Sequence, residues 1–589
     1  MQKVVKFKQE RWNLKDLLPD VQPSTIKKYW EEIDHLVQQF VSYRPKLQST
    51  ISWATIEEAI HLSERITERI AKISAYASLW FSMDTSNQEA RAFRDQMQQK
   101  LAAIENQMLF FSLWFKQLDE KNAKRLIRQA GKYAYLLERE RLTKKYALSE
   151  PEEKVINIKD THGSEALISL YDLITNNFQF PLTLKGKKKL LTREEMVRYA
   201  HDTNPDIRKQ AYQSLLKKYQ DNHDVLGEMY KHAVADWRSE SVQLRGYKTS
   251  IDARNIGNNI SNKAVQALLS ACREERGIFQ EFFRLKGKLL GQKLTRYDLY
   301  APVHGKEKNY SYSQGVQLVL DCYDNFSPEL AKLARKIFAE RHIDSVVHKG
   351  KMGGAYCYDI NPGVTPYVLV NYTGKQRDVA TLAHELGHAV HDLLTHKHSN
   401  LMNHPPLTLA ETASIFGEMI VTDKLLASTK NAEQQQALLA SKLDDIYASI
   451  GRQGYFVMFE EAAHEEVQQG ATVDELSRLY LKNLKEQFGT ALPVSDEFKV
   501  EWISIPHIYH TPFYCYAYAF GNLLTLALYK MYQKEGKDFV PSYLRFLSHG
   551  GSKSPKDIGA ELGIDFEKKA FWKQGFQQVK NMTELLRKL

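Results

Sequence analysis

Hydrophobic residues recur every three or four positions along the N-terminal third of the chain. One such stretch spans residues 56–77 and a second spans residues 93–111, with charged and glutamine-rich positions between the apolar ones. This period predicts amphipathic helices. Because each apolar stripe needs a neighbour to cover it, we expect these helices to pack against one another rather than to present a free binding face.

Helix-start signals recur in the next part of the chain. The segments 149–153, 192–195 and 204–206 each place Ser, Thr or Asn ahead of proline or acidic residues, which is typical of helix N-termini. Between the first two lies an apolar segment, 178–184, followed by the lysine-rich run Lys185–Lys189. We interpret that run as a solvated loop.

The pattern changes to strands between residues 343 and 373. Residues 349–358 form a glycine-rich turn that enters a strand-like segment, and residues 365–372 are β-branched and aromatic, which favours a strand. The hairpin predicted here has two possible roles, a scaffold or an edge strand that pairs with an extended peptide. In the second case the candidate substrate-binding residues are Gly353, Gly354, Ala355 and Tyr356.

The next apolar pattern, over residues 379–393, predicts a helix that carries His384 and His388. Residues four apart lie on one helix face, so the two imidazoles can occupy two corners of a zinc tetrahedron. Glu385 lies close enough to act on a water at such an ion, as the general base does in metallopeptidases. Five matching positions alone would be a weak signal, so the surrounding sequence matters.

A third zinc ligand is predicted from residues 407–419, which follow two prolines and form one further helix in our interpretation. Glu411 and Glu418 are seven residues apart, on one face and among apolar residues, and buried carboxylates need a partner. We assign Glu411 as the third ligand and Glu418 as a residue that orients a ligand histidine through its other nitrogen. Asp392 is a further candidate for that orienting role. The histidines that we interpret as ordinary polar residues are His391 and His404.

Composition describes an ordinary globular protein. The chain has 589 residues, of which 43% are hydrophobic and 26% charged, enough for a large core. The net charge of +10 raises the possibility of nucleic-acid binding. The basic residues are dispersed among acidic ones and no recognition motif accompanies them, so we expect no nucleic-acid partner.

The cysteines and the N-terminal segment indicate the cellular compartment that we expect. The four cysteines are widely separated, without Cys-x-x-Cys spacing, which favours reduced thiols. The first eleven residues lack the apolar core of an export signal, and no apolar run is long enough to span a bilayer. We therefore expect a cytoplasmic protein without a membrane partner. The sequence leaves the oligomeric state open.

The metal-binding motifs resemble those of a known family. His384–His388 and the Glu411–Glu418 segment are similar to the zinc metallopeptidases of the thimet oligopeptidase and oligoendopeptidase F family. Further segments resemble the oligoendopeptidase F branch: 148–153, 299–302, 353–356, 547–552, 562–565 and 571–572. The resemblance covers most of the chain and is weakest over the first hundred residues.

The resemblance implies a mainly α, neurolysin-like fold, in which two helical lobes flank a deep substrate channel and a small β-sheet lies near the zinc helix. It implies one zinc ion per chain and short unstructured peptides as substrates. From the change of pattern before the helix start at 192–195 we divide the chain into an N-terminal helical lobe, 1–190, and a zinc metallopeptidase catalytic region, 191–589. The oligoendopeptidase F N-terminal region would cover about 115–190.

A tyrosine- and histidine-rich segment, residues 506–518, completes the candidate site. Two histidines and several phenols in one segment are groups that can stabilise an oxyanion. The resemblance implies that a histidine and tyrosines from this region line the cleft opposite the zinc. The candidates are His507 or His510 and Tyr514 or Tyr516, and the spacing does not decide between them. Tyr518 we interpret as a packed aromatic residue.

Together these predictions describe a zinc-dependent endopeptidase of short peptides, in which Glu385 activates the attacking water. Two other hypotheses remain open: a zinc hydrolase of another amide, and a non-catalytic peptide-binding protein of the same fold. A binding protein would need no general base, so the presence of Glu385 favours an enzyme.

Overall fold

The computed structural model describes residues 6–303 and 308–589. Residues 1–5 belong to the N-terminal segment in which we expected no export signal, so that part of the expectation lies outside the described residues. Contacts between residues divide the chain into two compact units, each assembled from separate stretches of sequence. Unit 1 comprises Met1–Glu150, Glu307–Leu425 and Met531–Ile564, and unit 2 comprises Pro151–Lys306, Leu426–Lys530 and Asp565–Leu589. The division predicted near residue 190 stays a prediction, since these units alternate along the chain.

Unit 1 is mostly helical and contains a three-stranded sheet. Its helices are α1 Pro23–Val41, α2 Trp53–Met83, α3 Gln88–Gln117, α4 Glu120–Gln129, α5 Ala134–Leu142, α14 Tyr312–Phe326, α15 Pro328–Ala339, α16 Gln376–Thr395, α17 Leu407–Ala410, α18 Thr412–Ser428, α24 Val540–Leu547 and α25 Pro555–Ala560. Its strands are β3 Ile343–Asp344, β4 Tyr356–Tyr358 and β5 Tyr367–Leu369.

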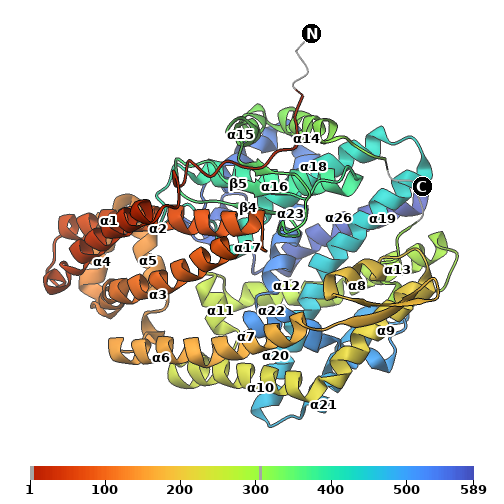
Figure 1. Cartoon of the computed structure of the whole chain (residues 1–589), viewed down its shortest axis with the longest axis horizontal. Coiled ribbons are helices and arrows are strands. Elements are labelled where there is room, and N and C mark those ends of the chain that lie inside the picture. The colour runs from red at the N-terminus through yellow and green to blue at the C-terminus, as the bar shows by residue number, and fades with distance from the viewer. Residues whose placement is uncertain (1–5, 304–307) are drawn as a thin grey trace. The chain divides into compact units, whose positions relative to one another are not determined.

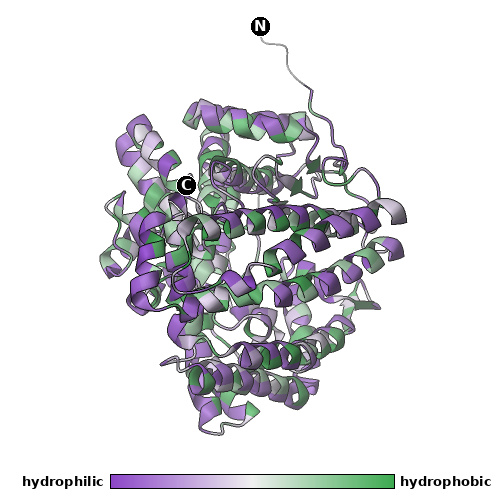
Figure 2. Ribbon diagram, turned by 90° about the vertical axis from the view of Figure 1, so that its left-hand side faces the viewer, coloured by the Kyte–Doolittle hydropathy of each residue, from purple (hydrophilic) through white to green (hydrophobic). Residues whose placement is uncertain are grey.

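The two N-terminal stripes form α2 and α3, as predicted. The Ser52 and Asn87 side chains cap these helices by accepting hydrogen bonds from backbone N–H groups. The two helices pack against each other, and Ile66, Ile73 and Met97 lie in the core that they share with α1. Figure 2 shows that hydrophobic and hydrophilic residues alternate along the helices, as the period requires.

The predicted hairpin is confirmed and belongs to the sheet of unit 1. Strand β4 pairs antiparallel with β5, and β3 pairs parallel with β5, so the strand order is β3-β5-β4. Within the described residues β4 is therefore an edge strand. Helix α16 packs on β4 and β5 (Figure 1) and also contacts α14, α15 and α24.

Unit 2 is also mostly helical. Its elements are α6 Glu150–His162, α7 Ser164–Asn176, β1 Phe180–Leu184, β2 Lys187–Leu191, α8 Arg193–Ala200, α9 Pro205–Asp221, α10 His223–Arg238, α11 Asp252–Gly257, α12 Asn262–Glu274, α13 Arg276–Leu289, α19 Ala432–Ser449, α20 Gly451–Gln468, α21 Val473–Phe488, α22 Pro506–His510, α23 Tyr516–Glu535 and α26 Lys569–Lys588. Short 3-10 segments occur in unit 2 at 296–298 and 496–504 and in unit 1 at 44–46, 131–133, 144–146 and 536–539, and a π-helical segment occurs in unit 2 at 239–244.

The predicted helix starts of unit 2 are confirmed, but our prediction of a loop at Lys185–Lys189 is wrong. Thr192 and Glu195 form a reciprocal capping box at α8, and Asn204 caps α9. The lysine run that we interpreted as a loop is mostly the exposed strand β2, which pairs with β1 through a turn at Lys185–Gly186. Pairing with the alternating strand β1 decides the structure here, because exposed lysines are compatible with either state.

Two further findings concern the cysteines and the length of the helices. All four cysteines are free in the structure. Among the described residues, no helix combines the length and the apolar composition needed to cross a membrane.

Candidate metal centre and active site

Helix α16 carries both predicted ligand histidines. Its N-terminus is held by Asp378, whose carboxylate accepts hydrogen bonds from the backbone N–H groups of Thr373 and Lys375. The His384 and His388 rings lie one turn apart, with centroids 4.9 Å apart. The apolar residues that hold the opposite face in the core are Val379, Leu382, Leu386 and Val390.

We predicted one continuous helix around Glu411. In the structure Glu411 instead lies at the break between α17 and α18. Thr412 and Ser414 donate hydrogen bonds from their hydroxyls to the backbone carbonyls of Leu409 and Glu411. Such bonds compete with regular helix hydrogen bonding, which accounts for the break. Ser414 also donates to Glu411 Oε2 at 2.8 Å and so orients the carboxylate.

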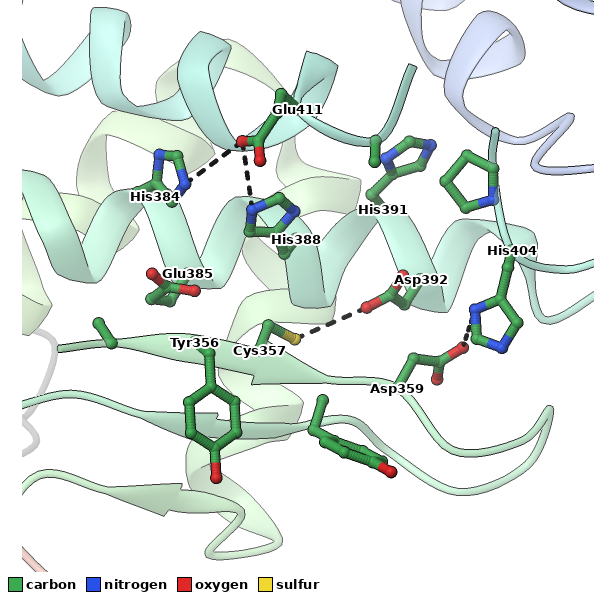
Figure 3. Close-up of a pocket in the computed structure, with 14 residues that line it drawn as sticks. Tyr356, Cys357, Asp359, His384, Glu385, His388, His391, Asp392, His404 and Glu411 are labelled. Carbon is green, nitrogen blue, oxygen red and sulfur yellow. Dashed lines mark hydrogen bonds and ion pairs between the residues drawn. The ribbon is translucent and has the colours of Figure 1, made fainter. Parts of the chain in front are cut away.

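The three predicted ligand residues come together at one point (Figure 3). Glu411 Oε2 lies 3.4 Å from Nε2 of His384 and 3.4 Å from Nε2 of His388. Ligand atoms on a tetrahedron with bonds of about 2.0–2.1 Å lie about 3.3–3.4 Å apart. Charge-assisted hydrogen bonds are shorter, at about 2.7–2.9 Å. The spacing therefore fits three ligands of a tetrahedral cation better than a hydrogen-bonded cluster.

The charges around the histidines also suit a cation. Burial would lower the pKa of His384, but the Glu418 and Glu411 carboxylates outweigh it and raise that pKa to about 9. Burial would raise the pKa of Glu411, whereas His388 and His384 lower it to about 2. The same carboxylates would stabilise a divalent ion in place of the protons.

Glu418 lies behind His384, on the side away from Glu411. Its Oε2 is 3.5 Å from His384 Nδ1, the ring nitrogen opposite the candidate ligand atom. A carboxylate in this place fixes the tautomer and the orientation of a ligand histidine.

Close packing between the two ligand-bearing elements depends on Gly387. A Cβ on this residue would lie 2.6 Å from the Ala413 carbonyl oxygen and 2.6 Å from the Ser414 Cα. A side chain there would push α18 away from α16, and with it Glu411 away from the histidines. The glycine inside the motif therefore keeps the three ligand atoms together.

Glu385 lies beside the ligand group and lines the same cavity. The residue is 6% exposed, and burial raises the pKa of its carboxyl group above the ordinary value despite the two histidines. A partly desolvated carboxylate with a raised pKa is a stronger base, as a general base requires.

The cavity of about 550 Å³ extends from the ligand group along α16 and β4. Ala355 and Tyr356 line it, whereas Gly353 and Gly354 are exposed at the start of the strand. Asn371 holds this glycine turn by donating to the carbonyls of Met352 and Gly354. The remaining members of the lining are Cys357, Tyr358, Asp359, His384, Glu385, His388, His391, Asp392, His404, Pro405, Ala410 and Glu411.

Asp392 lies at the far end of this cavity. Among the described residues, its carboxylate contacts the Cys357 thiol, 3.6 Å away, and not a ligand histidine (Figure 3). Burial and the neighbouring Asp359 raise its pKa well above the ordinary value. Its predicted orienting role therefore has less support than that of Glu418.

The two histidines interpreted as ordinary polar residues also lie at this end. His391 is buried, and burial lowers its pKa to about 4. His404 is exposed, with Nδ1 3.6 Å from Asp359. Asp359 accepts stronger hydrogen bonds from His396 at 2.9 Å and Asn403 at 2.7 Å.

The loop after α16 is held by residues 547–552, one of the segments that resemble the family. Gly551 donates its backbone N–H to the Met402 carbonyl at 2.9 Å, and His398 bonds the Ser548 carbonyl at 2.9 Å. Gly550 has a φ of 51°, and a Cβ on it would clash with the Asn403 backbone. This segment therefore supports one end of the cavity.

The tyrosine- and histidine-rich segment lies in unit 2, at α22 and the start of α23. His507, Tyr514 and Tyr518 form a half-buried cluster: the Tyr514 ring is 6.2 Å from His507 and 5.1 Å from Tyr518. Tyr516 is fully buried, and its hydroxyl accepts a hydrogen bond from Asn258 at 2.7 Å. His510 is exposed and bonds Asp172 at 2.8 Å. Burial lowers the pKa of His507.

Sequence reasoning missed the role of Ser414 beside Glu411. Ser414 follows Glu411 by three residues, a spacing at which a serine hydroxyl can reach back to a preceding residue. Tyr518, which we interpreted as a packed aromatic residue, does pack against His507 and Tyr514.

Helix α16 with His384, Glu385 and His388, together with Glu411 at the break between α17 and α18, has the residues of a metallopeptidase site. The sequence profile of peptidase family M3 matches residues 198–578, and that of oligopeptidase F matches residues 114–180. The chain belongs to peptidase family M3, and it is an oligopeptidase of that family.

Similarity to known proteins supports this family assignment. It is 27% identical to an oligoendopeptidase F homologue of Borreliella burgdorferi, over 98% of both chains. It is 25% identical to the oligopeptidase PepF of Bacillus subtilis, over 99% of this chain and 88% of that protein. The structure matches that of oligoendopeptidase F from Enterococcus faecium with a TM-score of 0.73 and 20% identity, over 95% and 98% of the two chains. The predicted family and mainly helical fold with small sheets are confirmed.

Proposed function

We propose that the protein is a zinc-dependent endopeptidase that hydrolyses internal bonds of short unstructured peptides. The observation that carries this proposal is the 3.4 Å spacing of Glu411 from both histidines, next to the buried carboxylate of Glu385. His384, His388 and Glu411 would hold one zinc ion and leave a position for water and substrate, as catalytic zinc sites do.

Zinc, when bound there, supplies a Lewis acid and makes the attacking water more acidic. Glu385 accepts the proton of that water on its carboxylate and afterwards delivers it to the leaving amine. Its raised pKa favours the second step, because a protonated carboxyl group must persist until the amine departs. Glu418 holds His384 in the tautomer that presents Nε2 to the ion.

Strand β4 would bind the peptide backbone. Its position at the edge of the sheet and along the cavity leaves its outer edge available for β-pairing with an extended chain. The turn at Gly353 and Gly354 has no side chains that would obstruct this approach. Pairing of this kind requires an unfolded segment, which restricts substrates to flexible peptides.

We propose that His507 and Tyr514 of unit 2 donate hydrogen bonds to the oxyanion that forms at the scissile carbonyl. Their half-buried rings support this choice over Tyr516 and His510. The Tyr516 hydroxyl already accepts a hydrogen bond in the core, and the His510 ring bonds Asp172. Tyr518 packs against both rings and supports them.

The four free cysteines favour a reducing compartment, and we propose that the protein acts in the cytoplasm. Its partners there would be short peptides.

A series of internally quenched fluorescent peptides of increasing length, assayed beside the zinc content of the same sample, tests the function. We expect one zinc per chain, cleavage at internal bonds, and no cleavage of the same sequence inside a folded protein. Equal hydrolysis of single acyl-amino acids and of peptides would instead identify a hydrolase of another amide. Peptide binding without turnover, at full zinc occupancy, would identify a non-catalytic binding protein.

A further inference from the structure

The segment that connects α22 and α23 in unit 2 has an unusual backbone. Phe513 has a φ of 59°, in the left-handed region that residues with a side chain rarely adopt. It immediately precedes Tyr514, so the direction of the Tyr514 side chain depends on this conformation. A strained residue at such a place persists only where surrounding contacts enforce it.

The strongest of these contacts comes from Glu460 in α20. Its Oε1 accepts a hydrogen bond from the Phe513 backbone N–H at 2.8 Å. Glu460 is 0% exposed, and its other oxygen has no hydrogen-bond partner among the described residues. Burial raises the pKa of this carboxyl group to about 8, although Phe513 and Arg254 oppose the shift.

Arg254, in α11, holds the same segment from another element. Its Nε donates a hydrogen bond to the Pro512 carbonyl at 3.1 Å. Both polar groups of the Pro512–Phe513 peptide bond are thus held: its carbonyl accepts from Arg254, and its N–H donates to Glu460. In addition, the Phe513 ring packs on the buried His464 ring, with centroids 4.5 Å apart.

A carboxyl group in this position is a poor choice for stability alone. Burying it without a full set of partners is unfavourable, and an apolar residue of the same size would avoid that cost. The arrangement instead fixes one backbone conformation, and this conformation determines how Tyr514 lies against His507 and Tyr518.

We propose that Glu460 and Arg254 are positioning residues that hold the Thr511–Cys515 connection so that Tyr514 is presented beside His507 for catalysis. The inference rests on the proposed oxyanion role of Tyr514, and it adds two residues on other helices that the reaction requires without their touching the substrate. Catalytic geometry is sensitive to shifts of about 1 Å, so loss of the anchors would slow the chemical step.

The test compares Glu460→Leu with Glu460→Gln. Leucine removes the acceptor while filling the site, and glutamine keeps an oxygen for the Phe513 N–H. We expect Glu460→Leu to lower kcat about tenfold or more and to leave KM nearly unchanged. We expect Glu460→Gln to behave as wild type.

Hydrogen exchange of the peptide that covers residues 511–518 gives a readout independent of activity. This peptide should exchange faster in Glu460→Leu and remain protected in Glu460→Gln. Wild-type kcat and exchange in Glu460→Leu, or equal losses in the leucine and glutamine variants, would overturn the proposal.

Arg254→Met keeps the test decisive if the leucine variant does not fold, because Arg254 is only partly buried. It should raise exchange over 511–518 and lower kcat, and wild-type values for both would contradict the anchoring role. Tyr514→Phe separates this inference from the proposed function. If Tyr514→Phe turns over peptides like wild type, the oxyanion role is wrong. If it is slow while Glu460→Leu is not, the positioning role alone is wrong.

Discussion

In the candidate metal-binding region of unit 1 both candidate ligand histidines share helix α16, and Glu411 lies at the break between α17 and α18. In the tyrosine- and histidine-rich segment of unit 2, by contrast, a strained connection depends on helices distant in sequence. Glu460 and Arg254 lie 53 and 258 residues from the backbone groups that they bond. Local geometry therefore fixes the first region, whereas tertiary packing fixes the second.

Because the two regions are held in different ways, substitutions in them should have different effects. In the proposed mechanism the side chains of the metal-binding region would act directly on the ion or the water, so single substitutions should remove the function outright. In the unit 2 segment, neighbouring tyrosines have unlike surroundings, so apparently equivalent substitutions should give unlike results.

The largest effect is expected for Glu385→Gln. The amide cannot accept the water's proton, so kcat should fall by about 10²–10⁴-fold, while zinc remains bound because the three ligands are intact. Peptide turnover and zinc content measured on the same sample check this. Substantial turnover by the zinc-loaded variant would remove Glu385 from the role of general base.

A pair of tyrosine variants comes next. Tyr514→Phe should lower kcat by about 10²-fold if its hydroxyl stabilises the oxyanion. Tyr516→Phe should retain turnover but lose about 1–3 kcal/mol of unfolding free energy, because the half-buried Asn258 amide loses its acceptor. Kinetics and denaturant unfolding of both variants are the measurement. The reverse pattern would exchange the roles of the two residues.

Glu418→Gln should weaken zinc binding by about tenfold, because the neutral amide orients His384 less firmly. Asp392→Asn is its matched control: the carboxylate contacts Cys357, and zinc affinity should stay close to that of wild type. Competition with a chromogenic chelator measures both. Equal losses would show that Asp392 also orients a ligand.

The smallest effect is expected for Gly387→Ala. A methyl group 2.6 Å from the Ala413 carbonyl oxygen should cost about 1–3 kcal/mol of unfolding free energy, with weaker zinc binding. Gly353→Ala serves as the control, since nothing lies within 4 Å of a Cβ there. Denaturant unfolding that shows equal stabilities would contradict the packing role of Gly387.

These two regions also show how far the sequence could predict the structure. The helical stripes, the caps at Thr192 and Asn204, the hairpin and the placement of His384, His388 and Glu411 follow from local periodicity and spacing. The break at Glu411 was missed because it depends on hydroxyls that bond the backbone. The proposed choice of Tyr514 over Tyr516 rests on Asn258, which follows α11 and is distant in sequence, so spacing along the chain could not make it. The strand β2 was missed because exposed lysines carry no apolar signal.

Titration of zinc into chelator-treated, metal-free protein tests the central claim most directly, with peptide turnover and bound zinc measured at each point. We predict that metal-free protein is inactive and that turnover rises in proportion to zinc, reaching its maximum at one ion per chain. In the His388→Ala variant, addition of zinc up to about one ion per chain should not restore turnover. Full peptidase activity in the metal-free wild-type protein would contradict the account.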